Sequence, residues 1–142
     1  MDYPIEFFSE DIDFSLKDTE QVSDWIASVI AQHGQELSSL TYVFCSDEYL
    51  YKMNVEYLDH DTLTDIITFN SADENGIIEG DIFISIDRVR DNASDVGTSF
   101  TDELHRVIIH GVLHLLGLKD KSEQEAALMR KEEDSSLSLR KF

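Results

Sequence analysis

Two histidines four residues apart, His110 and His114, lie in an apolar stretch that runs up to Gly117. Side chains at this spacing project from the same face of a helix, so both imidazoles can reach one ion. Gly117 stands where the helix has to end, because glycine accepts the left-handed conformation that stops a helix. The chain can then turn back and bring Asp120 towards the rings. The segment therefore predicts a central helix with a metal site on one face.

Two imidazoles and one carboxylate suit a zinc ion that keeps one position for water, as in catalytic rather than structural zinc sites. The order His-x3-His-x2-Gly-x2-ligand resembles the zinc-binding pattern of the metzincin proteases, with Asp120 in the last place. These proteases carry their general base, a glutamate, directly after the first histidine, where this chain has Gly111. A peptidase that works through such a glutamate is not expected. A hydrolase whose water is deprotonated by the metal or by a distant carboxylate stays open.

We predict His110, His114 and Asp120 as the metal ligands and the catalytic residues. The same histidine pair also fits simple packing on an apolar helix, and the added glycine and oxygen ligand favour the metal. His105 lies five residues before His110, a rotation of about 140° on a helix. It therefore faces elsewhere and is predicted to be structural or solvent-exposed.

The length of 142 residues predicts a single domain over residues 1–142. No apolar run approaches the length needed to cross a membrane. The acidic N-terminal segment lacks the positive charge typical of a secretory signal. The one cysteine, Cys45, cannot form an internal disulfide and is predicted to be a buried thiol. These features indicate a cytoplasmic protein without a membrane partner.

The net charge of −19 is unevenly spread along the chain. Residues 1–87 hold two basic and twenty acidic side chains (−18), whereas residues 88–142 hold nine and ten (−1). The total argues against nucleic acid as a partner. However, the positive charge is concentrated in the segment that carries the histidines, and a bound dication would add to it. An anionic substrate near the site therefore stays open, as does an acidic surface that only keeps the protein soluble.

Hydrophobic spacing and turn residues predict the order β-α-β-α-β-β-α-α-α. This order indicates an α+β fold with a four-stranded mixed sheet and about five helices. The turn Asp73–Gly76 predicts that the last two strands form a hairpin, and the polar segment Asp59–Asp65 predicts a loop. Ser46 and Ser99 are predicted helix caps. The expected strands are 5–8, 40–45, 66–69 and 80–86, and the expected helices are 17–33, 47–56, 86–96, 105–116 and 122–135.

Three further motifs precede the histidines, namely Asn54-x-x-Tyr57, Thr64-Asp-Ile-Ile-Thr-Phe69 and Gly80-Asp-Ile82. In order and spacing, from about Asn54 to Asp120, the chain resembles the bacterial YbeY proteins. The resemblance implies a zinc-dependent endoribonuclease of the single-strand type with one Zn²⁺ per chain. It implies a role in ribosomal RNA maturation, at the 3′ end of 16S rRNA, and in ribosome quality control. The implied partners are ribosomal RNA, the small ribosomal subunit, and ribosomal proteins or an assembly GTPase.

The chain departs from the family pattern at two positions. Asp120 replaces a third histidine, a tolerable change because zinc accepts an aspartate oxygen at a similar distance. It should make the site more anionic and its bound water less acidic. Leu58 stands where many members have an arginine thought to help with the phosphate. The candidates to replace that arginine are Arg88, Arg106, Lys119 and Lys121.

The preferred mechanism is metal-assisted cleavage of a phosphodiester, in which a 2′-hydroxyl nucleophile would make a neighbouring glutamate unnecessary. Thr64-Asp65 and Gly80-Asp81 are expected to wall the cleft. Asp65 either orients a ligand histidine or caps a turn. Two alternatives stay open. One is a ribosome-assembly factor whose metal is mainly structural, and the other is a metallohydrolase of small phosphoesters or amides.

Overall fold

The computed structural model describes residues 3–58 and 64–142, so most of the loop predicted at 59–65 lies outside the described residues. The element order is β-α-β-α-β-β-α-α-α, as predicted. The α+β fold class with a four-stranded mixed sheet and five helices is confirmed over the described ranges. The elements are β1 (Ile5–Ser9), α1 (Thr19–Gln32), β2 (Glu36–Cys45), α2 (Asp47–Leu58), β3 (Ile66–Asn70), β4 (Ile77–Ser85), α3 (Ile86–Val96), α4 (Phe100–Leu115) and α5 (Glu123–Leu137).

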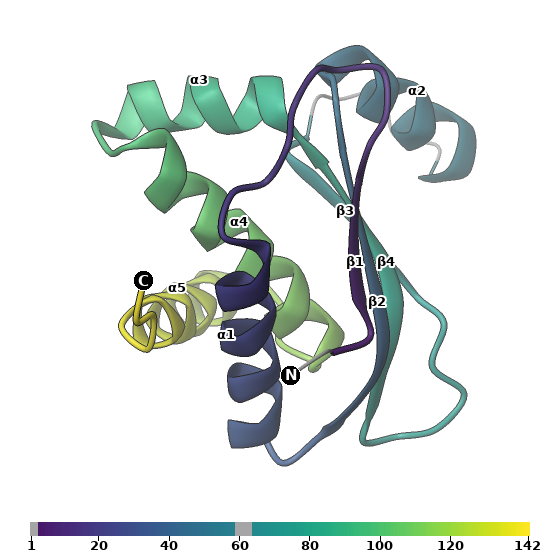
Figure 1. Ribbon diagram of the computed structural model, residues 1–142, viewed down its shortest axis with the longest axis vertical. Helices are drawn as coiled ribbons and strands as arrows, with labels where there is room; N and C mark the ends of the chain where they lie inside the picture. The colour runs from purple at the N-terminus through teal and green to yellow at the C-terminus, as the bar shows by residue number, and fades with distance from the viewer. Residues whose placement is uncertain (1–2, 59–63) are drawn as a thin grey trace.

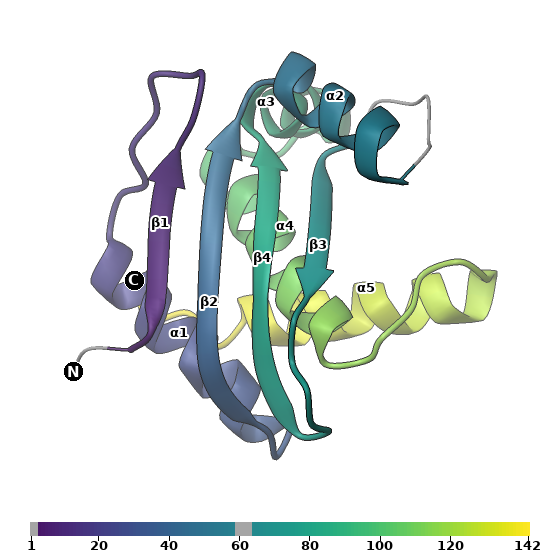
Figure 2. The ribbon, with the colours of Figure 1, turned by 90° about the vertical axis from the view of Figure 1, so that its right-hand side faces the viewer.

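The four strands lie in the order β1-β2-β4-β3. β1, β2 and β4 are parallel, and β3 runs antiparallel to β4 as the first strand of the predicted hairpin. Helices α1, α4 and α5 lie on one side of the sheet, whereas α2 lies at the end of the sheet near β3 (Figures 1 and 2). The face that carries α4 and α5 therefore holds the predicted site, beside the edge strand β3.

β2 and β4 begin earlier than their sequence patterns predict. β2 starts at Glu36 rather than Leu40, and β4 starts at Ile77 rather than Gly80. The two additional segments pair with each other, since Glu36 is the partner of Ile77 in the parallel register. The segment Glu-Leu-Ser-Ser is too polar to predict a strand. Pairing with a neighbouring strand satisfies its backbone groups and overrides that weak local preference.

Helix α4 is the centre of the helical layer. It begins after Ser99, whose hydroxyl accepts a hydrogen bond from the backbone N–H of Asp102 at 3.1 Å, as the predicted cap requires. Its apolar face is fully buried against the sheet. A Cβ on Gly111 would lie 3.0 Å from side-chain atoms of both Ile66 and Ile82. Glycine therefore lets α4 approach the sheet closely, and the position that holds glutamate in zinc proteases faces the sheet here and has no room for a side chain.

Of the two roles predicted for His105, the structure shows the structural one and not the solvent-exposed one, and Cys45 is buried as predicted. The imidazole of His105 is buried between the rings of Trp25 and Phe142, with ring centroids at 5.7 and 5.4 Å. Arg140 donates to its Nδ1 at 2.8 Å. Cys45 is a buried free thiol. Neither residue lines the pocket described below.

Candidate active site

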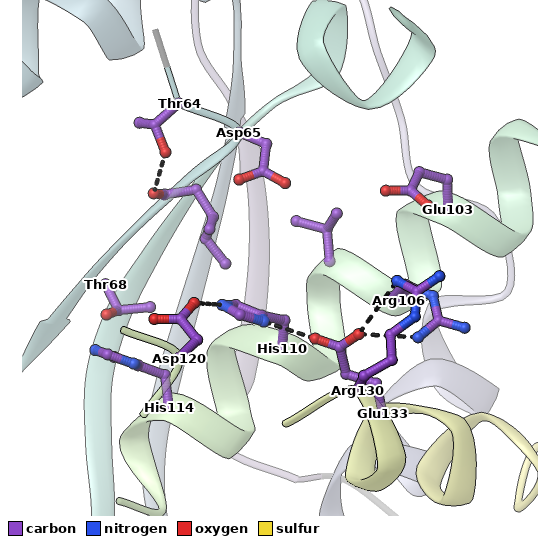
Figure 3. A pocket seen from close by; sticks show the side chains of 12 residues that line it. Thr64, Asp65, Thr68, Glu103, Arg106, His110, His114, Asp120, Arg130 and Glu133 are labelled. Atoms are coloured by element: carbon purple, nitrogen blue, oxygen red, sulfur yellow. Dashed lines mark hydrogen bonds and ion pairs between the residues drawn. The ribbon is translucent and has the colours of Figure 1, made fainter. Parts of the chain in front are cut away.

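A pocket of about 420 Å³ lies where α4 and α5 meet the start of β3 (Figure 3). All three predicted site residues line it: His110 and His114 come from α4, and Asp120 comes from the segment that follows. Thr64 and Asp65 form the wall nearest β3, as predicted. The structure therefore places the predicted residues around one shared space, together with three charged side chains that the sequence did not predict: Glu103 on α4, and Arg130 and Glu133 on α5.

The end of α4 explains how Asp120 returns to the histidines. Gly117 has a φ of +108° and its N–H donates to the carbonyl of His114 at 3.0 Å. The N–H of Leu118 donates to the carbonyl of Leu113 at 3.1 Å. These two hydrogen bonds form a Schellman motif, which ends the helix and reverses the chain. The reversal brings Asp120 Oδ2 to 3.5 Å from His110 Nε2.

This separation is compatible with a shared zinc ion. Zinc binds imidazole nitrogen and carboxylate oxygen at about 2.0–2.2 Å, so two ligand atoms on a tetrahedral ion lie about 3.4 Å apart. The measured 3.5 Å between His110 Nε2 and Asp120 Oδ2 is close to that value. In the view of Figure 3 the ring of His114 lies on the other side of Asp120 from His110. The imidazole and carboxylate donors therefore suit zinc, and the distance between His110 Nε2 and Asp120 Oδ2 fits a shared ion.

His114, the third predicted ligand, does not complete a metal site with His110 and Asp120 in this structure. Within residues 3–58 and 64–142, no group of three or more His, Cys, Asp or Glu side chains forms a complete metal site. His114 and Asp120 are both exposed, and their side chains are free to change rotamer without disturbing the core. The His110 ring, in contrast, is held in place.

Glu133 on α5 holds the other nitrogen of His110. Its Oε2 lies 2.7 Å from His110 Nδ1, and only 8 % of its side chain is exposed. Arg106 donates to the second oxygen, Oε1, at 2.9 Å. A carboxylate at Nδ1 fixes the imidazole tautomer and leaves Nε2 as the lone-pair donor. This is the orienting role considered for Asp65, and for His110 the structure gives it to Glu133.

The sequence offered no signal for Glu133. It lies 23 residues after His110 on a separate helix, so no helical spacing connects the two residues. Only the packing of α5 against α4 brings them together. The polar face of α5 otherwise resembles any solvated helix.

Charge and burial shift the pKa of several pocket groups, among them His110, Glu133 and Asp65. Burial favours the neutral form of His110, but the hydrogen bond to Glu133 and the surrounding carboxylates outweigh it and raise its pKa. Burial also opposes ionisation of Glu133, but its bonds to His110 and Arg106 prevail and lower its pKa. Burial raises the pKa of Asp65, against the opposing effect of His110. The pocket therefore holds one carboxyl, Glu133, that ionises more readily than usual and another, Asp65, that protonates more readily than usual.

Of the four basic residues predicted to contact the phosphate, only Arg106 lines the pocket. Arg88 is bound by Asp47 and Asp91, both at 2.9 Å, and lies outside the pocket. Lys119 and Lys121 also lie outside it, whereas Arg106 lines it. A second lining arginine, Arg130 on α5, was not among the candidates.

Two residues of the sequence motifs, Tyr57 and Asp81, line a hollow on the opposite face of the sheet. Tyr57 packs edge-on against Phe69, with ring centroids 6.5 Å apart, in a separate hollow that Asp81 also lines. The prediction that Gly80 and Asp81 wall the active-site pocket is therefore wrong, because neither residue lines it. Asp81 alternates along β4 with the residues that face α4, and Gly80 packs against Phe69 and Leu115. Leu58 is exposed at the end of α2 and is likewise absent from the pocket lining.

The fold and the pocket together define an α+β protein in which a buried helix presents two histidines and the segment after it brings a third candidate ligand towards them. A family model described as Endoribonuclease YbeY matches residues 5–140. The chain belongs to the endoribonuclease YbeY family. The resemblance stated from the sequence motifs is thereby confirmed.

Several curated relatives and one solved structure support this assignment. Endoribonuclease YbeY of Cytophaga hutchinsonii is 51 % identical over 138 residues, covering 97 % of this chain and 96 % of the relative. That of Flavobacterium johnsoniae is 48 % identical over 132 residues, covering 93 % and 94 %. The solution structure of TM1509 from Thermotoga maritima superposes with a TM-score of 0.63 at 22 % identity, covering 94 % of this chain and 89 % of that one. This last match concerns the fold alone. In the described part of the chain, no helix has the length and apolar character needed to span a membrane.

Proposed function

We propose that this chain is a zinc-dependent endoribonuclease that cleaves single-stranded segments of ribosomal RNA. In this proposal it acts in the cytoplasm on the small ribosomal subunit, in maturation of the 3′ end of 16S rRNA and in ribosome quality control. The relatives' name, endoribonuclease YbeY, supports RNA phosphodiester bonds as the substrate. The observation that carries the proposal is the 3.5 Å approach of Asp120 to His110, whose other nitrogen is held by Glu133.

His110, His114 and Asp120 are the proposed ligands of one zinc ion. Two nitrogens and one oxygen are a common donor set for catalytic zinc, and they leave one coordination position open. When bound, zinc supplies Lewis-acid chemistry at a phosphodiester oxygen or a water molecule. The exposure of His114 and Asp120 gives a substrate access to that open side of the site.

Two other pocket residues have roles in this proposal: Glu133 orients a metal ligand, and Asp65 exchanges a proton. Glu133 keeps His110 Nδ1 protonated and its Nε2 directed into the pocket. Asp65 faces the pocket from the β3 side, and burial raises the pKa of its carboxyl. We assign to Asp65 the exchange of a proton with the reacting hydroxyl, because it is a pocket carboxyl not engaged by an arginine in the described contacts. No residue at position 111 is needed for this role.

A second candidate function is a ribosome-assembly factor in which the metal is mainly structural. The observation that favours it is the charge: the chain carries −19, and Leu58 brings no cation to the pocket. Such a factor would bind ribosomal proteins or an assembly GTPase through its acidic surface. Catalysis would then be weak or absent.

One experiment separates these functions. Purified wild-type protein and the Asp120→Ala variant are analysed for zinc content, cleavage of single-stranded and structured RNA, and association with small ribosomal subunits. The nuclease proposal predicts about one zinc per wild-type chain, and loss of both zinc retention and RNA cleavage in Asp120→Ala. An assembly factor predicts that wild type binds subunits without cleaving RNA. Cleavage at the wild-type rate by metal-free enzyme would refute the zinc mechanism.

A further inference from the structure

The pocket has too little free positive charge for its proposed substrate. Four carboxylates line it, those of Asp65, Glu103, Asp120 and Glu133, against two arginine side chains. A bound dication would offset part of this negative charge, but the carboxylate among its ligands would in turn neutralise part of the charge of the ion. An RNA strand brings one negative charge per phosphate, and Leu58, which lies outside the pocket, has no charge to offset it. The two arginines are therefore the pocket-lining cations that an RNA phosphate can meet.

Arg106 is already committed to protein partners. Its Nη1 donates to Glu133 at 2.9 Å and its Nη2 to Asp134 at 2.6 Å, and 19 % of the side chain is exposed. These two carboxylates use both ends of the planar guanidinium. If Arg106 turned towards a phosphate, the buried carboxylate of Glu133 would lose one of its two short contacts, the one that Arg106 donates. Leaving a buried charge partly unpaired in this way is energetically unfavourable.

Arg130 is differently placed. Its side chain is 62 % exposed, and its ion pair with Glu133 is long, at 3.9 Å. The oxygen it approaches already accepts the shorter bond from Arg106. A guanidinium has five N–H donors, and within the described residues this long ion pair engages few of them. Arg130 can therefore bind a phosphate without breaking a short protein contact.

The pocket adjoins a second hollow between α4 and α5, of about 440 Å³. Glu103, Arg106 and Arg130 line both spaces, and Arg140 lines the second. Arg140 forms a short ion pair with Asp102, at 3.1 Å, so like Arg106 and unlike Arg130 it is already engaged by a carboxylate. Arg130 thus stands at the passage between the two hollows, where a strand entering the pocket from the α5 side has to pass.

We propose that Arg130 binds the RNA backbone at the phosphate next to the cleaved bond, and that the strand runs from the active-site pocket into the hollow between α4 and α5. This assignment rests on the proposed nuclease function. In this chain Arg130 on α5 provides the phosphate contact that Leu58 at the end of α2 does not. It acts on binding, because the contact is made equally before and during the reaction.

The test compares Arg130→Gln with Lys131→Gln, using zinc-loaded protein and a single-stranded RNA oligonucleotide. Lys131 is the next residue on α5, is exposed, and lines neither hollow, so its variant removes the same charge from a neighbouring surface. We expect Arg130→Gln to raise KM about tenfold, as for the loss of one charge-assisted hydrogen bond, with kcat little changed. The slope of log affinity against log salt concentration should become shallower by about 0.7. Arg130→Lys should recover part of the salt dependence.

The possible outcomes distinguish a failure of the nuclease function from a failure of the role assigned to Arg130. If wild type cleaves no RNA, the nuclease function itself fails. If wild type cleaves and Arg130→Gln matches Lys131→Gln in KM and salt slope, the nuclease function stands and the role of Arg130 is refuted. A fall in kcat at unchanged KM would also refute a binding role. Circular dichroism melts of both variants check that the exposed substitutions leave the fold intact.

Discussion

Replacing Glu133 with glutamine tests whether α5 tunes the proposed metal site. The side chain is nearly isosteric but loses the charge that His110 Nδ1 meets at 2.7 Å. With only 8 % of the Glu133 side chain exposed, water cannot substitute for that charge. Removing an orienting carboxylate of this kind costs about 10- to 100-fold in metal affinity. We therefore expect the zinc dissociation constant of Glu133→Gln to rise by at least about tenfold.

The assay is competition for zinc between the protein and a chromogenic chelator, which needs no RNA and no activity. Glu132→Gln is the matched control, because Glu132 is adjacent on α5 and forms an ion pair with His33, at 3.6 Å and away from the pocket. The control should bind zinc as wild type does. Equal zinc affinities for Glu133→Gln and Glu132→Gln would refute the reasoning, since the short contact to His110 would then contribute nothing to the site.

Two further predictions concern Asp120 and His105. Asp120→His replaces an anionic ligand by a neutral one, so it should keep zinc and shift the pH–rate profile of RNA cleavage to lower pH; an unchanged or higher profile would contradict this. Burial, with help from Arg140, lowers the pKa of His105 to about 4. Its contribution to stability is therefore complete above pH 6.5 and is lost as pH falls towards 4, by about 3 kcal/mol in all. Urea unfolding at both pH values should show a smaller acid loss for His105→Gln, and an identical loss would contradict the assignment.

Much of the fold could be predicted because local pattern and tertiary structure agree. The buried positions of α1 have helical spacing, and α4 is apolar between a serine cap and a terminating glycine. The sequence could not predict the first residues of β2, which become a strand only by pairing with β4. Such pairing joins residues about 40 positions apart, and no local pattern records it.

The site could be predicted only where its residues are close in sequence. His110, His114 and Asp120 lie within eleven residues, and one helix with a glycine end brings them to one pocket. Glu133 and Arg130 belong to a separate helix whose polar residues carry no distinguishing pattern. Their relevance depends on how α5 packs across α4, which is decided by the whole core.

The central claim is that His110, His114 and Asp120 hold one zinc ion in the pocket. A crystal structure of the zinc-loaded protein, with data collected at the zinc absorption edge, tests it directly. We predict one strong anomalous peak within about 2.3 Å of a nitrogen from each histidine and of an Asp120 oxygen. A peak bound elsewhere, or an occupied pocket in which Asp120 points away from the ion, would contradict it.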